Sequence, residues 1–158
     1  MNAGRPSNPS RQGCEPNLTA LLAVALPILL TANQACAGAA CVVAKRLGDS
    51  LAIEWVAGPD ESAASAIDKA SRKLVGQGYR SKGQDVHPQA DSELPHAYMA
   101  IVKTRYTTLT GRSRTSYGCG YSPRSAAEAE REAVYDLRNY SWGWKPAFGY
   151  EVMKAFRY

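Results

Sequence analysis

The sequence predicts an α+β domain in which a mainly antiparallel sheet is covered on one face by two helices. Extended apolar runs come in pairs that are separated by turn residues, and each pair precedes an alanine-rich helical segment. Pairs of this kind are typical of β-hairpins. The order strand, strand, helix, strand occurs twice, and the short connections favour antiparallel pairing.

The two halves of the chain align as a duplicated unit. Their helical segments share a pattern of serine, alanine and leucine at a constant offset of 63 residues. The pattern runs from Ser62 to Leu74 and again from Ser125 to Leu137. A fixed period predicts a repeated β-β-α-β unit, and a chance match between two alanine-rich helices is the alternative.

Residues 1–37 have the features of a secretory signal peptide. Two arginines precede an apolar run at 18–30, and a small-residue triplet at 35–37 follows it. This order predicts export and cleavage near Ala37. A helix over the apolar run would span ~20 Å, less than the ~30 Å hydrocarbon core of a bilayer. We therefore expect no membrane span in the mature chain and a periplasmic or secreted location.

Removal of the signal leaves residues 38–158 as a single α+β domain. We expect two units, at about 41–86 and 97–158, joined by a linker at 87–96. The linker contains two prolines and several polar residues. It has little to bury, which is typical of a surface loop.

The first unit begins with a hairpin, formed by residues 41–47 and 51–56. Asp60 or Ser62 can cap the helix that follows, because their side-chain oxygens accept from amides of the first turn. A short polar edge strand is expected at 79–86.

The second unit repeats this order with a hairpin at 98–106 and 114–121. Ser125 and Glu128 form a capping box, in which the hydroxyl and the carboxylate each satisfy an amide of the first turn. Small residues on the buried stripe of this helix let it approach the sheet closely. A final strand is expected at 148–158.

The cysteines follow from the compartment. Cys14 and Cys36 leave with the signal, so the mature chain keeps Cys41 and Cys119. An even number of cysteines in an oxidising compartment predicts a disulfide between the two units. Two alternatives remain: a catalytic thiol at Cys119, and lipid attachment at Cys36 or Cys41.

The mature chain is mildly basic, with 17 Lys and Arg against 13 Asp and Glu. No acid occurs between Glu93 and Glu128, which predicts a positive face on the second hairpin. The binding candidates on this face are Lys103, Arg105, Arg112 and Arg114. Export argues against a nucleic-acid partner. It leaves a protein or an anionic envelope polymer, while a plain solvated hairpin is the alternative.

Aromatic residues cluster at 140–150 and form a second binding candidate. Exposed tryptophans and tyrosines dominate binding energetics at protein interfaces. We take Trp142, Trp144 and Tyr150 as binding residues. The alternative is that these rings fill the end of the core.

The second hairpin and its helix carry one longer motif, Tyr117-Gly118-x-Gly120-Tyr121-x3-Ser125-x2-Glu128-Ala129-Glu130-x2-Ala133. This motif resembles the repeat of a group of exported bacterial domains of unknown function. In those repeats an aromatic- and glycine-bearing hairpin leads into an A-E-x-x-A helix, which often ends with a cysteine that is absent here. The resemblance implies an exported protein and assigns no functional residue.

The two histidines, His87 and His96, share the linker with several carboxylates. Their spacing matches no strong metal-binding pattern, so we expect neither a metal site nor a cofactor. The sequence also contains no nucleophile elbow, metalloprotease helix or phosphate-binding glycine loop.

Together these features predict a small exported, non-enzymatic protein that binds a macromolecular partner in the cell envelope. An inhibitor or an immunity-type protein is one concrete form. One alternative is a small envelope hydrolase that uses Glu54, His87 or His96. The other is a lipid-anchored structural component of the envelope.

Overall fold

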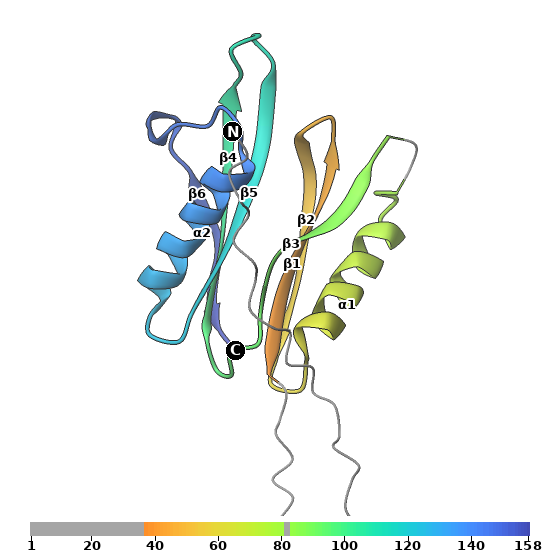
Figure 1. Cartoon of the computed structure of the whole chain (residues 1–158), viewed down its shortest axis with the longest axis vertical. Coiled ribbons are helices and arrows are strands. Elements are labelled where there is room, and N and C mark those ends of the chain that lie inside the picture. Colours follow the sequence, from red (N-terminus) through yellow and green to blue (C-terminus); the bar gives the residue numbers. More distant parts are fainter. Residues whose placement is uncertain (1–36, 81–82) are drawn as a thin grey trace, which may run out of the picture. The chain divides into compact units, whose positions relative to one another are not determined.

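Two three-stranded antiparallel sheets, each with its own helix, make up the computed structural model, which describes residues 37–80 and 83–158. The described residues belong to one compact unit. The strand order is β2-β1-β3 in the first sheet and β5-β4-β6 in the second. Figure 1 shows α1 against the first sheet and α2 against the second.

The first repeat forms the first sheet and its helix. It consists of β1 (Gly38–Arg46), β2 (Asp49–Gly58), α1 (Ala63–Gly76) and β3 (Asp85–Ser92). The second repeat forms the other sheet. It consists of β4 (Tyr98–Thr107), β5 (Ser113–Ser122), α2 (Ala126–Tyr140), the short 3₁₀ helix η1 (Pro146–Phe148) and β6 (Glu151–Arg157).

The α+β class, the antiparallel pairing and the twice-repeated strand-strand-helix-strand order are confirmed. The layering differs from a single sheet with both helices on one face. Each helix covers the outer face of its own sheet, and the inner faces of the two sheets pack together. The central strands explain this, because β1 directs Val42 toward α1 and Val43 toward the other sheet. A strand that is apolar on both faces needs cover on both sides.

The core between the sheets draws on both repeats. Its buried members come from β1, β2, β4 and β5: Ala39, Cys41, Val43, Ile53, Met99, Ile101, Tyr117 and Cys119. Cys41 and Cys119 form the predicted disulfide, with an Sγ–Sγ distance of 2.10 Å and a Cα–Cα distance of 6.5 Å. The bond joins β1 of the first repeat to β5 of the second. Both sulfurs are used in it, so neither is a free thiol or a lipid-attachment site.

The two helices bury equivalent residues. Leu74 of α1 and Leu137 of α2 are fully buried at the expected offset. In the second repeat, Gly118 and Gly120 lie directly under α2. A Cβ atom on Gly120 would come within 2.1 Å of the carbonyl oxygen of Ala129. The glycines of β5 therefore allow the close approach that was predicted from the alanines of the helix, of which Ala129 and Ala133 are buried.

A shared irregularity supports the duplication. The β1–β3 register shifts between Cys41 and Val42, and the β4–β6 register shifts between Ile101 and Val102. Each shift inserts one extra residue, Gln89 in β3 and Met153 in β6. A β-bulge at the same place in both sheets is a feature that duplication explains.

Strand β3 occupies most of the segment expected to be the linker 87–96. The edge strand runs from Asp85 to Ser92 and pairs with β1, so residues 79–84 lie before it. Pro88 is tolerated because β3 is an edge strand and the proline adjoins the bulge. Gln89 and Ser92 are buried, although the polar composition favoured a loop.

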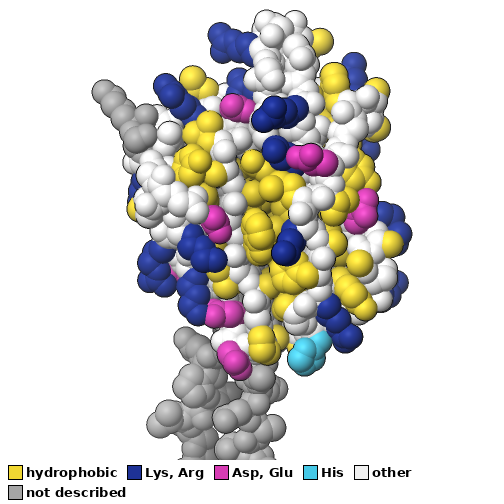
Figure 2. Space-filling model, turned by 180° about the vertical axis from the view of Figure 1, so that it is seen from behind, with side chains coloured by type: hydrophobic (Ala, Val, Ile, Leu, Met, Phe, Trp, Pro, Cys, Tyr) yellow, Lys and Arg dark blue, Asp and Glu magenta, His cyan; other side chains and the backbone are white. Residues whose placement is uncertain are grey.

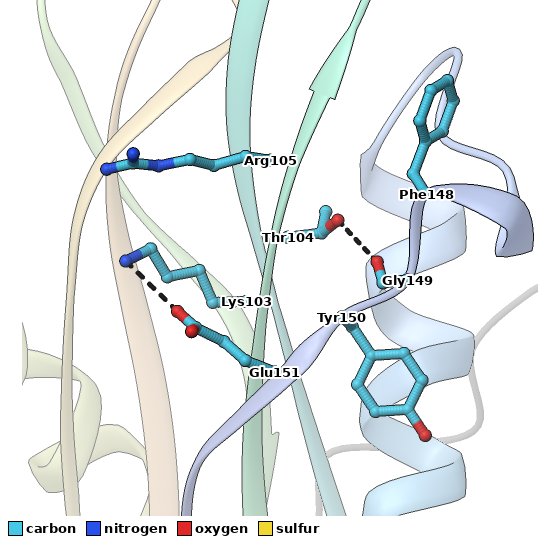
Figure 3. Close-up of a pocket in the computed structure, with 7 residues that line it drawn as sticks. All are labelled: Lys103, Thr104, Arg105, Phe148, Gly149, Tyr150 and Glu151. Carbon is cyan, nitrogen blue, oxygen red and sulfur yellow. Dashed lines mark hydrogen bonds and ion pairs between the residues drawn. The ribbon is translucent and has the colours of Figure 1, made fainter.

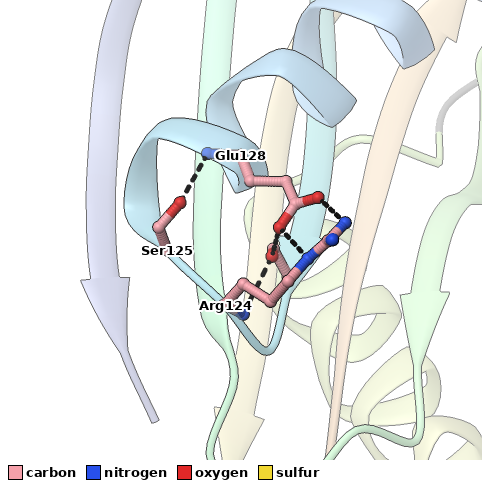
Figure 4. Close-up of polar contacts among 4 residues, drawn as sticks. Arg124, Ser125 and Glu128 are labelled. Carbon is pink, nitrogen blue, oxygen red and sulfur yellow. Dashed lines mark hydrogen bonds and ion pairs between the residues drawn. The ribbon is translucent and has the colours of Figure 1, made fainter.

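The helix caps match the sequence in part. Ser62 caps α1, and the hydroxyl of Ser125 accepts from the Glu128 amide at 3.2 Å. The Glu128 carboxylate does not return to the Ser125 amide as a capping box requires. It accepts instead from the Ser122 hydroxyl and from the Arg124 guanidinium (Figure 4). These two donors lower the pKa of Glu128, the Ser122 hydroxyl more strongly.

The predicted signal peptide lies outside the described residues except for Ala37. Cys14 and Cys36 lie there as well. Within the described chain, neither helix has the length and apolar character needed to cross a membrane.

Candidate functional site

The second sheet has a notch at the edge of its central strand. Strand β4 pairs with β6 only as far as Lys103, which lies opposite Glu151, whereas residues 104–107 continue alongside β5 alone. The chain before β6 turns away from β4 at this point and leaves a hollow of about 540 Å³. This edge notch is lined by Lys103, Thr104, Arg105, Phe148, Gly149, Tyr150 and Glu151 (Figure 3).

The turn that opens the notch is fixed by hydrogen bonds. Gly149 has a φ of 67°, a conformation that favours glycine. Its carbonyl oxygen accepts from the Thr104 hydroxyl at 2.7 Å and from the Trp144 indole at 3.2 Å. The same indole also contacts the Thr104 hydroxyl at 3.2 Å. These hydrogen bonds therefore fix the position of the turn relative to β4.

Two cations project from one side of β4. Lys103 and Arg105 both point toward the first sheet (Figure 3). The Lys103 ammonium lies 3.4 Å from the Glu151 carboxylate. Arg105 is exposed and forms no ion pair with any residue that the structure describes. Arg105 is therefore available to bind an anion from solution. The Lys103 ammonium beside it is held by the Glu151 carboxylate.

Two aromatic rings lie on the opposite side, toward α2. Phe148 and Tyr150 each expose 43% of their surface. The Phe148 ring lies 6.0 Å from the ring of Tyr106. The Tyr150 hydroxyl donates to the Glu130 carboxylate of α2 at 2.9 Å, and this bond raises the pKa of Tyr150. The rings are positioned by contacts but remain accessible.

The notch thus brings together residues from both predicted binding surfaces. Lys103 and Arg105 come from the basic hairpin and Tyr150 comes from the aromatic segment. Arg112 and Arg114 lie elsewhere. Arg112 is exposed near the hairpin turn, and the Arg114 guanidinium donates to the Leu47 carbonyl of the first repeat.

The two tryptophans of the aromatic segment have opposite environments. Trp144 is only 8% exposed and belongs to the core beneath α2, in line with the core-packing alternative. Trp142 is 90% exposed, and its carbonyl accepts from the Tyr106 hydroxyl at 3.3 Å. Trp142 does not line the notch.

The residues considered for hydrolysis lie on separate elements. The Glu54 carboxylate in β2 accepts from Gln77 at 2.7 Å and lies 3.9 Å from the Lys73 ammonium. His87 is in β3, where burial and, to a smaller extent, Lys45 lower its pKa. His96 follows β3 in a turn. Across residues 37–80 and 83–158, no three His, Cys, Asp or Glu side chains gather as metal ligands do.

Sequence reasoning missed Thr104, Gly149 and Glu151. Each is placed by the β4–β6 register and by the turn before β6, which depend on pairing across 48 residues (Lys103 with Glu151). A local signal exists only for Gly149, since a glycine before a final strand indicates a turn.

The face opposite to that of Figure 1 carries a central apolar patch bordered by Lys and Arg side chains (Figure 2). Strand β6 adds to the exposed apolar surface of the molecule, because Val152 and Met153 are each more than 40% exposed. Cations beside apolar surface are typical of a rim around a binding patch.

Comparisons with protein-family models, with curated proteins and with solved structures find no match for this chain.

Proposed function

We propose that this protein is an exported, non-enzymatic binding protein that captures an acidic, extended segment of another protein in the edge notch. The observation that supports this most directly is the division of the notch by chemistry. Cations line one side of the β4 edge and aromatic rings line the other. An inhibitor or immunity-type protein would use such a site.

An extended segment fits this division because its side chains alternate between two faces. Acidic residues on one face would meet Arg105, beside which Lys103 is paired with Glu151. Apolar residues on the other face would meet Phe148 and Tyr150. The backbone of the segment would lie beside residues 104–107 of β4, which pair with β5 only. Addition of a strand to a sheet edge is a recurrent mode of peptide recognition.

A protein partner fits better than an anionic envelope polymer. A polymer with repeated charge needs a row of unpaired cations, whereas Lys103 is already paired with Glu151. Rings beside an arginine are typical of the residues that dominate protein interfaces. The Cys41–Cys119 disulfide supports export, since disulfides persist in oxidising compartments.

The test uses two peptides of equal composition. In one, glutamate and leucine alternate; in the other, they form two blocks. We expect the alternating peptide to bind at least about tenfold more tightly, measured by isothermal titration calorimetry. Arg105→Gln should weaken this binding by about 30-fold, the effect of removing an interface anchor. Arg112→Gln, a matched change in the same hairpin, should have no effect.

Three outcomes would overturn the proposal. Equal affinity for the two peptides would exclude recognition by alternating faces. Unchanged binding in the Arg105→Gln protein would place the site elsewhere. Tighter binding of an anionic polysaccharide such as polygalacturonate would favour the envelope-polymer alternative. Thermal unfolding of each variant controls for loss of fold.

A further inference from the structure

A second hollow lies on the other side of the segment that frames the edge notch. It has a volume of about 470 Å³ and is formed by α2 together with the chain from Trp144 to Tyr150. We call it the helix-side hollow. Its lining residues are Arg131, Val134, Tyr135, Arg138, Trp144, Pro146, Gly149 and Tyr150.

The body of this hollow is apolar. Val134, Trp144 and Pro146 contribute hydrocarbon and indole surface, and Tyr150 contributes a ring. Trp144 is held by hydrogen bonds to Thr104 and Gly149, so its indole is already in position. A preformed apolar hollow of this size is within the range of ligand sites for small molecules, roughly 300–1,000 Å³.

Two guanidinium groups give the hollow its charge. Arg131 and Arg138 are seven positions apart on α2, so they lie on one face about 10 Å apart along the axis. Both are exposed, and neither forms an ion pair within the described part of the chain. The acid Glu130 is engaged by the Tyr150 hydroxyl.

We infer that the helix-side hollow binds a small amphipathic carboxylate. Its ring or short acyl chain would lie against Trp144 and Val134. Its carboxylate would meet Arg131 or Arg138, because the planar guanidinium matches carboxylate geometry. A cation is excluded by the two positive groups, and a purely polar anion would leave the apolar body of the hollow unfilled. This site adjoins the edge notch and shares Gly149 and Tyr150 with it, but its two arginines belong to the hollow alone.

The experiment uses decanoate as the probe, with decan-1-ol and decyltrimethylammonium as matched ligands of other charge. The measurement is displacement of the fluorescent anion 1-anilinonaphthalene-8-sulfonate from the oxidised protein, with each ligand below its micelle concentration or solubility limit. We expect decanoate to displace the dye at least about tenfold more effectively than decan-1-ol, and the cation to be weakest. The dye itself should bind with a stoichiometry of one.

Five arginine variants locate the site. Arg131→Gln together with Arg138→Gln should weaken decanoate binding at least about tenfold, and the single changes identify the guanidinium that meets the carboxylate. Arg72→Gln removes an exposed arginine from α1 and should leave binding unchanged. Arg105→Gln in the edge notch should also leave it unchanged, so failure of this inference is distinguishable from failure of the proposed function.

Equal displacement by decanoate and decan-1-ol would overturn the inference, because charge would then play no part. Wild-type affinity in the double arginine variant would overturn it as well. So would the absence of any displacement at millimolar decanoate. The replaced side chains are exposed, and an unchanged thermal midpoint shows that a loss of binding is not a loss of fold.

Discussion

The two edge strands of the second sheet, β5 and β6, differ in how their free edges are covered. The free edge of β5 is covered by side chains. Asp49 accepts from the Thr115 amide at 2.7 Å, Gln89 donates to the Tyr117 carbonyl, and Asp136 accepts from the Cys119 amide at 2.9 Å. Within the described residues, no side chain bonds to the backbone of β6 between Glu151 and Arg157.

Equivalent positions show how this difference arises. Gln89 and Met153 are the extra residues of the two bulges, and Gln89 is buried while Met153 is 42% exposed. Asp136 of α2 corresponds to Lys73 of α1, whose ammonium lies 3.9 Å from the carboxylate of Glu54 in β2. Tyr121, whose hydroxyl donates to the Ala90 carbonyl at 3.2 Å, corresponds by register to Ala57.

The two repeats form similar sheets, and differences between equivalent positions cover the β5 edge and leave the β6 edge open. Unpaired strand edges are templates for pairing with another chain, and native proteins protect those that are not used. The open edge adjoins the notch that we propose for peptide capture. The comparison therefore predicts that changes at the covered β5 edge alter stability, whereas changes at the notch beside the open β6 edge alter binding.

The largest expected effect comes from the bond between the repeats. The disulfide closes a loop of 78 residues, and its removal should lower the free energy of unfolding by about 4 to 5 kcal/mol in the chain-entropy model. The test compares urea denaturation of the oxidised wild type with Cys41→Ala/Cys119→Ala. Dithiothreitol should destabilise the wild type and leave the double variant unchanged. Equal midpoints for the two oxidised proteins would contradict the prediction.

The close approach of α2 to β5 should give the next largest effect. Gly118 and Gly120 correspond by register to Glu54 and Val56 of β2, so only the second repeat depends on glycine here. Gly120→Ala places a methyl group 2.1 Å from a backbone oxygen, which should cost about 3 kcal/mol of unfolding free energy.

The control for this change is Gly76→Ala in α1, where an added Cβ meets nothing within 4 Å. Alanine there should be neutral or stabilise by about 0.5 kcal/mol, because it favours the helix. Both proteins are measured by urea denaturation. A Gly120→Ala protein as stable as Gly76→Ala would show that α2 can move away from β5 without loss.

Much of the fold followed from local pattern. Ser62 and Ser125 cap helices because each hydroxyl accepts from a first-turn amide. The two helices therefore begin at the equivalent positions that the sequence repeat predicts. The disulfide followed from the cysteine number and from the expectation of an oxidising compartment. The layering did not follow, because an apolar strand such as β1 shows that it is buried on both faces but not what covers each one.

The candidate site was predictable only in composition. Lys103, Arg105 and Tyr150 were identified from charge and ring content, but their convergence depends on where β6 leaves β4. Trp144 and Trp142 lie two residues apart and differ almost completely in exposure. Trp144 packs in the core beneath α2, and its indole forms hydrogen bonds with Thr104 and Gly149. The contact with Thr104 joins distant parts of the chain, so local sequence does not reveal it.

The smallest effect concerns the charge at the closed edge. Burial raises the pKa of Asp136, although hydrogen bonds from Gln89 and the Cys119 amide and the nearby Lys45 oppose the shift. A raised folded pKa stabilises the protein below the unfolded value, and this contribution is lost as pH rises through the folded pKa. Asp136→Asn cannot ionise, so it should gain stability relative to wild type over that interval, with a plateau above it.

Glu128 on the same helix provides a control of opposite sign. Its pKa is lowered by Ser122 and Arg124, so its contribution is present above the unfolded value and is lost as pH falls through the folded pKa. Wild type should therefore exceed Glu128→Gln in stability at neutral pH and lose that advantage in acid. Urea denaturation between about pH 3 and pH 8 measures both differences. If the two variants had parallel profiles of stability against pH, burial at the closed edge would not determine the pKa of Asp136.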